Sequence, residues 1–298
     1  MLNVYEQIDQ NKRKSSLVVA FFAVFVVLVI YVIGRALGSG PEMIIFALAL
    51  SGFSSLVGYF KGDKIILTLS GARPADRAKD FKLYTVVENL SLAAQIPKPK
   101  VFLIEDTAMN AFATGRDPDH ATVCATTGLV DRLDRTELEG VVAHELSHIK
   151  NYDIRLMSVV SVLVGLVTLL GDWFLRSSRG GRRGRKKEGG EVFMFIGFVL
   201  AILSPLIANL IKLAISRRRE YLADASAVKL TRFPDGLARA LAKLGVDKEP
   251  LEAANKATAH LYIANPLKNR HDRIGMFASM FSTHPPIKDR IKRLQEMS

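Results

Sequence analysis

The stretch His144-Glu145-Leu146-Ser147-His148 fits the pattern H-E-x-x-H. Residues four apart on a helix lie on one face, about 5–6 Å apart, so both imidazoles can meet one tetrahedral Zn²⁺. Glu145 is rotated off that face, where its carboxylate can accept a proton from water at the metal. The pattern therefore predicts His144 and His148 as zinc ligands and Glu145 as the catalytic base. The alternative is two exposed histidines with a solvated glutamate between them.

A hydrolytic zinc site needs a third protein ligand and one open position, and Glu220 is the predicted ligand. Apolar runs begin eight residues after His148 and end nine residues before Glu220. If these runs are antiparallel helices, the offsets are about 12 and 14 Å, so His148 and Glu220 lie at nearly the same height. Asp224, one turn later, is predicted to orient an imidazole. The alternatives are ion pairing of Glu220 with the arginines at 217–219 and a surface position for Asp224.

Two apolar runs near the N-terminus predict a transmembrane hairpin. Ser15–Gly34 is uncharged for 20 residues, about 30 Å as a helix, and Met43–Phe60 follows it. A signal peptide is disfavoured because no small-x-small cleavage site precedes the next charge. Basic residues at 12–14 and at 61 and 64 flank the hairpin. They place the N-terminus and the following domain in the cytoplasm.

A second hydrophobic hairpin is expected from Leu156–Gly171 and Val192–Ile211. Between them lies the linker Arg176–Gly190, with seven Lys or Arg residues. If both runs span the membrane, this linker emerges outside, against the positive-inside bias. The third run is also short, at 16 residues. Spanning and partial insertion therefore both stay open for this hairpin.

Composition supports a membrane partner rather than a nucleic acid. The net charge is +12, and 49% of the residues are hydrophobic although 23% are charged, so the apolar residues are gathered in blocks. Basic residues beside apolar blocks suit a lipid bilayer, and no aromatic-rich nucleic-acid motif accompanies them. The single cysteine, Cys124, excludes an internal disulfide and is expected to be buried in a strand.

These patterns predict a mainly α fold with a small β-sheet, made of integral-membrane helices and a zinc protease domain. Four parts are expected: the hairpin at 1–61, the first half of the protease domain at 62–153, the second hairpin at 154–215, and the second half of the protease domain at 216–298. Within the protease domain, the predicted helices are Phe81–Ala94, Thr136–Asp153 (with a capping box of Thr136 and Glu139), Glu220–Val246, Leu251–Ala264 and Pro285–Met297. The predicted strands are Lys100–Ile104, Ala121–Thr126 and an edge strand at Asn110–Gly115.

The whole chain resembles the bacterial heat-shock membrane proteases of the M48 peptidase family. The resemblance rests on His144–His148, on Glu220-Tyr-Leu-Ala-Asp224 after a second hairpin, and on Ser282-Thr-His-Pro-Pro286. It implies a gluzincin-like fold, one zinc ion held by the same three ligands, and peptide hydrolysis. It also implies that the edge strand pairs with substrate through Asn110, Ala111, Phe112 and Ala113, because an extended peptide can add to an exposed strand.

The remaining histidines and two arginines are weaker candidates. In the related proteases the histidine matching His284 lies near the zinc, where it could stabilise an oxyanion or act as a fourth ligand; capping a helix before Pro285 is the alternative. His120, His260 and His271 are expected to be structural or exposed. Arg273 and Arg290 are expected to be solvated helix charges.

The predicted function is zinc-dependent endopeptidase activity on membrane or misfolded proteins at the cytoplasmic face of the plasma membrane, in protein quality control. The resemblance supplies the substrate class and the stress role. A zinc-stabilised membrane holdase without turnover is the alternative, although structural zinc would need no base at Glu145. A transporter is disfavoured, because the apolar runs carry few polar groups for a substrate path.

Overall fold

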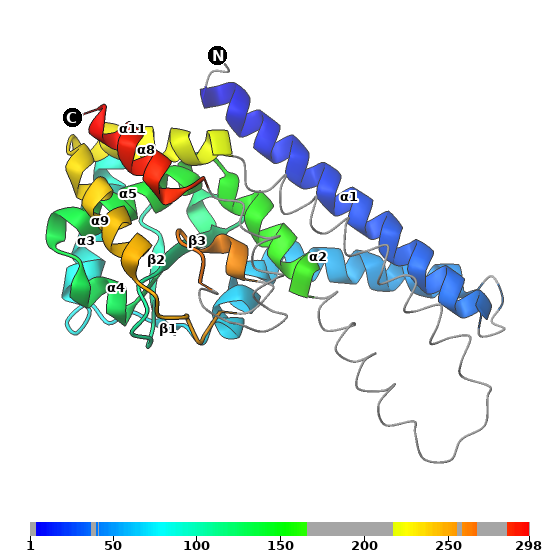
Figure 1. The fold of residues 1–298 in the computed structure, drawn as a ribbon. Helices are drawn as coiled ribbons and strands as arrows, with labels where there is room; N and C mark the ends of the chain where they lie inside the picture. Colours follow the sequence, from blue (N-terminus) through cyan, green and yellow to red (C-terminus); the bar gives the residue numbers. More distant parts are fainter. Residues whose placement is uncertain are drawn as a thin grey trace.

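The computed structural model describes residues 4–36, 40, 42–165, 217–254, 258–266 and 285–297. Figure 1 shows two long helices that project together from a body in which helices pack around a small sheet. The predicted linker 176–190 and the fourth apolar run, 192–211, lie outside the described residues. The start of the third run falls in a helix at 153–165.

The two projecting helices are α1 (Val4–Ala36) and α2 (Met43–Leu69), which pack against each other. Long runs of Leu, Val, Ile and Phe without proline favour a continuous helix here. Among the described residues one helix, Ile44–Leu69, is long and apolar enough to cross a membrane. Only 12% of its most apolar window is buried, and Ile45 is 74% exposed. The helix continues past the predicted end of the hairpin at residue 61.

The sheet has four strands in the order β1-β2-β4-β3. Its central strands, β2 (Lys100–Ile104) and β4 (Ala121–Thr126), are parallel and coincide with the predicted strands. β1 (Arg73–Pro74) is antiparallel to β2, and β3 (Ala111–Gly115) is antiparallel to β4. β3 therefore lies at the edge, as predicted. Cys124 is buried in β4, and burial raises the pKa of its thiol, which fits the expected packing role.

Helix α5 (Arg135–Lys150) carries the H-E-x-x-H stretch and begins one residue before the predicted start. The predicted capping box of Thr136 and Glu139 is wrong. The box is formed instead by Asp134, whose Oδ1 accepts from the Glu137 amide, and Glu137, whose Oε2 accepts from the Asp134 amide, both at 2.8 Å. Thr136 cannot cap because it already lies inside the first turn, where its hydroxyl donates to Asp134.

The other helices are α3 (Phe81–Ala94), as predicted, α4 (Thr127–Arg132), α8 (Arg217–Thr231), α9 (Pro234–Val246) and α11 (Ile287–Gln295). The single helix predicted over 220–246 is interrupted at Arg232, which has a φ of 55°, and Pro234 starts the next helix. The helix predicted over 251–264 is also wrong. Its described residues contain only the 3₁₀ turn η3 (Ala259–Leu261), while another such turn, η1 (Pro118–His120), precedes β4.

Helix α5 lies at the centre of the core, in contact with α3, α8, α9, β3 and β4. Most of its residues from Glu137 to Ile149 are buried. Gly140 allows α9 to approach closely, because a Cβ at this position would lie 2.7 Å from the Leu237 backbone nitrogen. This packing fixes the turns of α5 that carry residues 144–148.

Candidate metal centre

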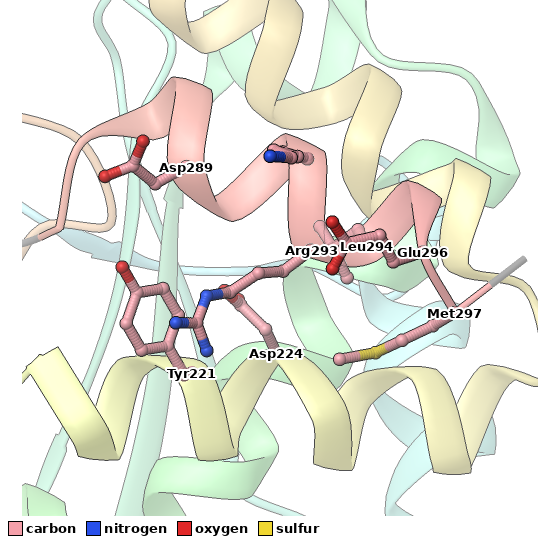
Figure 2. Close-up of a pocket in the computed structure, with 8 residues that line it drawn as sticks. Tyr221, Asp224, Asp289, Arg293, Leu294, Glu296 and Met297 are labelled. Carbon is pink, nitrogen blue, oxygen red and sulfur yellow. The ribbon is translucent and has the colours of Figure 1, made fainter.

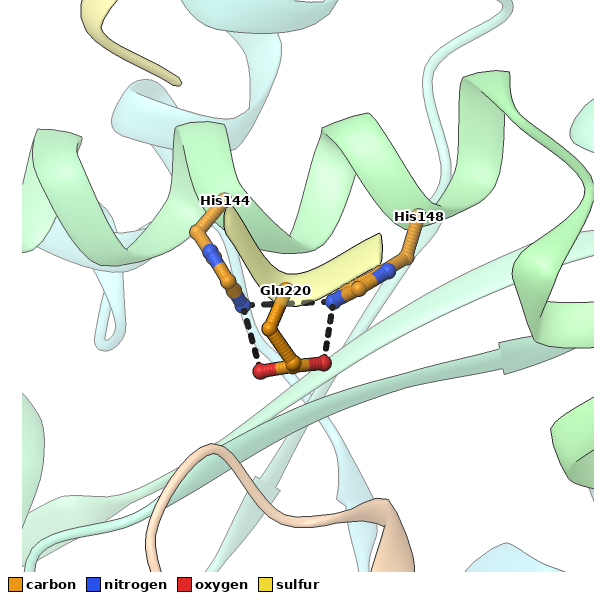
Figure 3. A group of neighbouring side chains, drawn as sticks. All are labelled: His144, His148 and Glu220. Carbon is orange, nitrogen blue, oxygen red and sulfur yellow. Dashed lines mark hydrogen bonds and ion pairs between the residues drawn. The ribbon is translucent and has the colours of Figure 1, made fainter. Parts of the chain in front are cut away.

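His144 and His148 project from one face of α5 towards Glu220 on α8 (Figure 3). Their Nε2 atoms are 3.2 Å apart. Glu220 Oε2 lies 3.8 Å from His144 Nε2, and Glu220 Oε1 lies 3.5 Å from His148 Nε2. The three residues are 1–5% exposed. The structure therefore brings together the three residues that the sequence proposes as ligands. His148 and Glu220 are 72 positions apart in the chain.

The separations of these atoms fit a small tetrahedral ion. Zinc binds nitrogen and oxygen at about 2.0–2.1 Å, so the ligand atoms of a tetrahedral site lie about 3.3 Å apart. The observed separations of 3.2, 3.5 and 3.8 Å cluster near that value. The donor set, two imidazoles and a carboxylate, is also one that hydrolytic zinc sites use.

A carboxylate contacts the second ring nitrogen of each histidine. Asp224 Oδ1 is 3.0 Å from His144 Nδ1, and Asp153 Oδ2 is 3.0 Å from His148 Nδ1. Since an ionised carboxylate can only accept, each Nδ1 donates to its carboxylate, and each Nε2 is the ring nitrogen that faces Glu220. The position of Asp224 agrees with its predicted orienting role. Sequence reasoning missed Asp153, for which the available signal was an acidic residue just past the end of the metal-site helix.

Arg290 is the main correction to the sequence interpretation. The sequence predicts a solvated charge here, yet Arg290 is 0% exposed and its guanidinium donates two hydrogen bonds to Asp224. Its Nε and Nη2 donate to the two oxygens of Asp224 at 2.9 and 2.6 Å, and its Nη1 lies 3.7 Å from Glu220 Oε2. Arg290 shares the buried face of α11 with Leu294, where the two buried carboxylates compensate its charge. Arg273 lies outside the described residues.

The charges around the cluster favour a divalent cation. Glu145, Glu220, Asp153 and Asp224 are each 2–3% exposed. Two cations face them, the buried Arg290 and the largely buried Arg219, which lies 3.6 Å from Asp153 Oδ1. With the four carboxylates ionised and the imidazoles neutral, these groups and the two arginines sum to a net charge of −2. A buried excess of this size is costly unless a cation compensates it.

Burial opposes protonation of His148, but its hydrogen bond to Asp153 and the nearby charges of Glu220 and Glu145 outweigh this and raise its pKa to about 9. Burial likewise opposes ionisation of Asp224, but Arg290 and His144 hold the pKa of Asp224 below its usual value. The same carboxylate raises the pKa of Arg290. Without a metal, a proton on His148 therefore compensates part of the negative charge of the surrounding carboxylates.

Glu145 lies on α5 between the two histidines and is 2% exposed. The structure keeps its carboxylate in the same buried region of negative charge, since it raises the pKa of His148 and of Arg290. It thus lies close enough to the cluster to act electrostatically on it.

The outer edge of β3 is partly occupied within the chain. Ala111 O accepts from Ile263 N at 3.0 Å, and Ser158 Oγ accepts from Gly115 N at 3.1 Å. The Asn110 amide donates to Ala264 O at 3.0 Å. Backbone groups of alternate residues face the same edge of an antiparallel strand. Ala113 is therefore the position at this edge whose backbone groups have no partner among the described residues. The ring of Phe112 packs against the ring of Tyr262, with the two centroids 5.0 Å apart.

A cavity of about 650 Å³ lies beside this network, between α8 and α11 (Figure 2). Tyr221 and Asp224 line it from α8, and the Arg293 guanidinium lies 3.9 Å from the centre of the Tyr221 ring. The three clustered residues are not part of its lining. The cavity thus borders the cluster only through Asp224.

Two of the other histidines have the structural or exposed positions that were expected. His260 is buried with its Nε2 3.0 Å from Ser161 Oγ, and His120 is half exposed beside Asp117. His271 and His284 lie outside the described residues.

Comparison with known proteins identifies the class to which this fold and site belong. The family model described as peptidase family M48 matches residues 77–298, so the chain belongs to this family of metallopeptidases. The membership confirms the resemblance found in the sequence and identifies the chain as a hydrolase of peptide bonds.

Similar curated proteins are named protease HtpX homologs. One from Dictyoglomus thermophilum is 47% identical over 98% of this chain and 94% of its own length. Another, from Caldanaerobacter subterraneus subsp. tengcongensis, is 44% identical over 99% of this chain and 98% of its own length. Among solved structures, Ste24p of S. mikatae has a similar fold, with a TM-score of 0.50 and 20% identity. That match covers 96% of this chain and 66% of the Ste24p chain.

Zinc binding is expected to depend on pH through His148. Its raised pKa means that the metal-free protein holds a proton there below about pH 9, and zinc must displace it. Zinc affinity should therefore rise by about tenfold per pH unit between pH 6 and 8, with about one proton released per ion. Competition with a chromophoric chelator and a pH-stat measure both quantities. Asp153→Asn should shift the dependence to lower pH, and a flat affinity in the wild type would contradict the prediction.

Replacing Arg290 is expected to destabilise the metal-free protein. Arg290→Gln leaves Asp224 buried without its cation, which typically costs about 3–5 kcal/mol of unfolding free energy. Lys292→Gln is the matched control, because Lys292 is exposed on the same helix and its loss should change stability by less than about 0.5 kcal/mol. Chemical denaturation in detergent measures both variants. Equal unfolding midpoints would show that the buried pair has no such role.

Proposed function

We propose that this chain is a membrane-bound zinc endopeptidase that cleaves membrane or misfolded proteins at the cytoplasmic face, in protein quality control. The observation that carries the proposal is the convergence of two imidazole nitrogens and one carboxylate, whose ligand atoms all lie within 4.8 Å of one another in a buried position. Family membership supports hydrolysis of peptide bonds. The substrate class and the cellular role come from the resemblance to heat-shock membrane proteases.

One zinc ion per chain would be held by the Nε2 atoms of His144 and His148 and by the Glu220 carboxylate. When bound, zinc polarises the scissile carbonyl and makes water nucleophilic at neutral pH. Three protein ligands leave a coordination position open, as hydrolytic sites need. Asp224 and Asp153 orient the two imidazoles through their Nδ1 atoms, and Arg290 keeps Asp224 ionised and in place.

Glu145 is the proposed general base and acid. Its carboxylate would take the proton of the attacking water as the new C–O bond forms, and would then donate that proton to the amine nitrogen as the peptide C–N bond breaks. This role suits a carboxylate that lies on the helix of the two histidines, between them in sequence, and is buried beside the cluster. His284 is proposed to stabilise the negative charge that develops on the carbonyl oxygen.

Substrate is proposed to bind as an extended segment along β3, which includes Ala111, Phe112 and Ala113 and follows Asn110. The strand is at the sheet edge and contacts α5, so a peptide paired with it would pass near the cluster. Ala113 has backbone groups that could make this pairing, but it is 3% exposed, so substrate can reach it only if the groups that cover it move. The bonds that Ile263 and Ser158 make with Ala111 and Gly115 limit the pairing to a short stretch unless those segments move.

The chain is proposed to be a multi-pass protein of the plasma membrane, anchored through α1 and α2. Side chains such as Ile45, Phe53 and Leu56 on α2 are 59–74% exposed, which suits lipid rather than water. Basic residues at the outer ends of both helices favour a cytoplasmic N-terminus and catalytic domain. The expected second hairpin at 154–215 is proposed to return the chain to this same side before Glu220.

Glu145→Gln is expected to abolish cleavage while metal binding persists, since the amide cannot accept a proton but does not alter the ligands. Loss of a general base costs about 10²–10⁴-fold or more in rate. Glu220→Ala is the contrasting variant and should lose both metal and activity. Metal analysis together with cleavage of casein or an unfolded membrane protein measures both outcomes. Undiminished cleavage by Glu145→Gln would refute its role, and a zinc-loaded wild type that never cleaves would favour a holdase.

Thiol labelling in intact cells is expected to report the orientation. Cys124 is buried and its raised pKa makes it unreactive, so single cysteines can be added to the native chain. Glu42→Cys, at the exposed turn before α2, should react with a membrane-impermeant maleimide in intact cells. Ala78→Cys, exposed in the catalytic part, should react only after permeabilisation. The reverse pattern would place the catalytic domain outside.

A further inference from the structure

The cytoplasmic end of α1 contacts the network around His148. Asn11 is 3% exposed although it lies in a helix that otherwise projects away from the catalytic body (Figure 1). Its Nδ2 donates to Asp153 Oδ1 at 2.8 Å and to Asn151 O at 2.9 Å. Its Oδ1 accepts from Arg219 Nη1 at 3.1 Å. Arg219 can only donate and the Asp153 carboxylate can only accept, so these partners determine the orientation of the amide.

Each of these partners belongs to the surroundings of a metal ligand. Asp153 holds the Nδ1 of His148 with its other oxygen, at 3.0 Å. Arg219 directly precedes Glu220 in the chain, and Asn151 follows the last residue of α5. Asn11 thus touches the segments after one ligand and before another. Its amide completes the hydrogen bonding of the carboxylate that orients His148.

The turn between α5 and Asp153 needs such support. Tyr152 has a φ of 59°, a left-handed conformation that is unfavourable for a residue with a side chain. This reversal of the chain is what returns the Asp153 carboxylate towards His148. Two residues of α1 hold the turn from outside: Asn11 bonds the residues on either side of Tyr152, and Lys12 Nζ lies 4.4 Å from the centre of the Tyr152 ring. Strained conformations persist where surrounding contacts determine them.

We propose that Asn11 is a positioning residue for the metal site, which couples the N-terminal helix to His148 through Asp153. The hydrogen bond from Asn11 fixes the Asp153 carboxylate in the rotamer that holds the His148 ring with Nε2 towards Glu220. A displacement of α1 removes this bond and loosens one metal ligand. The metal site is therefore complete only when the first helix is docked. The inference rests on the proposed metal site and extends it to a residue of the membrane anchor.

Metal affinity tests this coupling in the full-length protein in detergent. Asn11→Leu keeps the volume and the helix but removes all three hydrogen bonds. It should weaken zinc binding by about three- to tenfold, below or at the low end of the 10–100-fold typical for direct partners of a ligand. Asn11→Gln, which keeps an amide, should recover part of the loss. Gln10→Ala, exposed on the same helix, should bind zinc like the wild type. Competition with a chromophoric chelator gives the affinities.

A double-mutant cycle separates positioning from general stability. If Asn11 acts through Asp153, Asn11→Leu should have little further effect on zinc affinity in an Asp153→Asn background. The visible spectrum of the Co²⁺-loaded protein should change with Asn11→Leu but not with Gln10→Ala, because the spectrum reports ligand geometry. If Asn11→Leu does not fold, Asn11→Ala takes its place, since alanine favours the helix.

The outcomes separate this inference from the proposed function. Wild-type affinity and spectrum in the folded Asn11→Leu or Asn11→Ala variant would overturn the coupling and leave the metal site intact. An equal loss of affinity in the wild-type and Asp153→Asn backgrounds would also overturn it, since Asn11 would then act elsewhere. A wild type that binds no zinc would instead refute the proposed function itself.

Discussion

The structure depends on the burial of three electron-pair donors that point at one another. The Nε2 atoms of His144 and His148 and the carboxylate of Glu220 converge within 4.8 Å in a region closed to solvent. Such groups repel unless a cation or a proton lies between them, so the arrangement is stable only when positive charge is present. The raised pKa of His148 has the same cause, because the nearby carboxylates favour a positive charge on this ring when no metal is bound. The packing of α5 against α8 keeps the donors from separating.

Two successive sets of charged residues surround this centre. The inner carboxylate and imidazoles are followed by Asp224 and Asp153, and these by Arg290 and Arg219. The two arginines neutralise part of the charge of the carboxylates, which lowers the free-energy cost of burying them. The supporting residues of the two histidines come from different helices. Arg290 of α11 holds Asp224, which contacts His144, while Arg219 of α8 and Asn11 of α1 surround Asp153, which contacts His148. The C-terminal and N-terminal helices therefore meet at one site.

The N-terminal helices combine two environments that a soluble domain would not expose together. The apolar side chains of α2 face outward, with Ile45 and Phe53 more exposed than buried. Asn11 and Lys12, near the start of α1, instead contact the catalytic body. In the proposed arrangement, α1 lies in lipid at one end and donates a hydrogen bond to Asp153 at the other, which would link the orientation of the domain to the geometry of its site. This arrangement also explains why a strained turn at Tyr152 is tolerated beside the cluster.

The sequence by itself determined the parts that follow from local spacing. H-E-x-x-H on a helix puts two imidazoles on one face, short buried runs form β2 and β4, and long apolar runs form α1 and α2. Counting residues also predicted that Glu220 lies near His148, and the structure places the two together, although the hairpin assumed in that count lies outside the described residues. Only the tertiary structure decided which polar residues are buried around that centre. Arg290 has the local pattern of a surface charge, and Asn11 lies beside a membrane run. Their partners, Asp224 and Asp153, are 66 and 142 residues away. Contacts over such distances depend on how helices pack, which local periodicity does not encode.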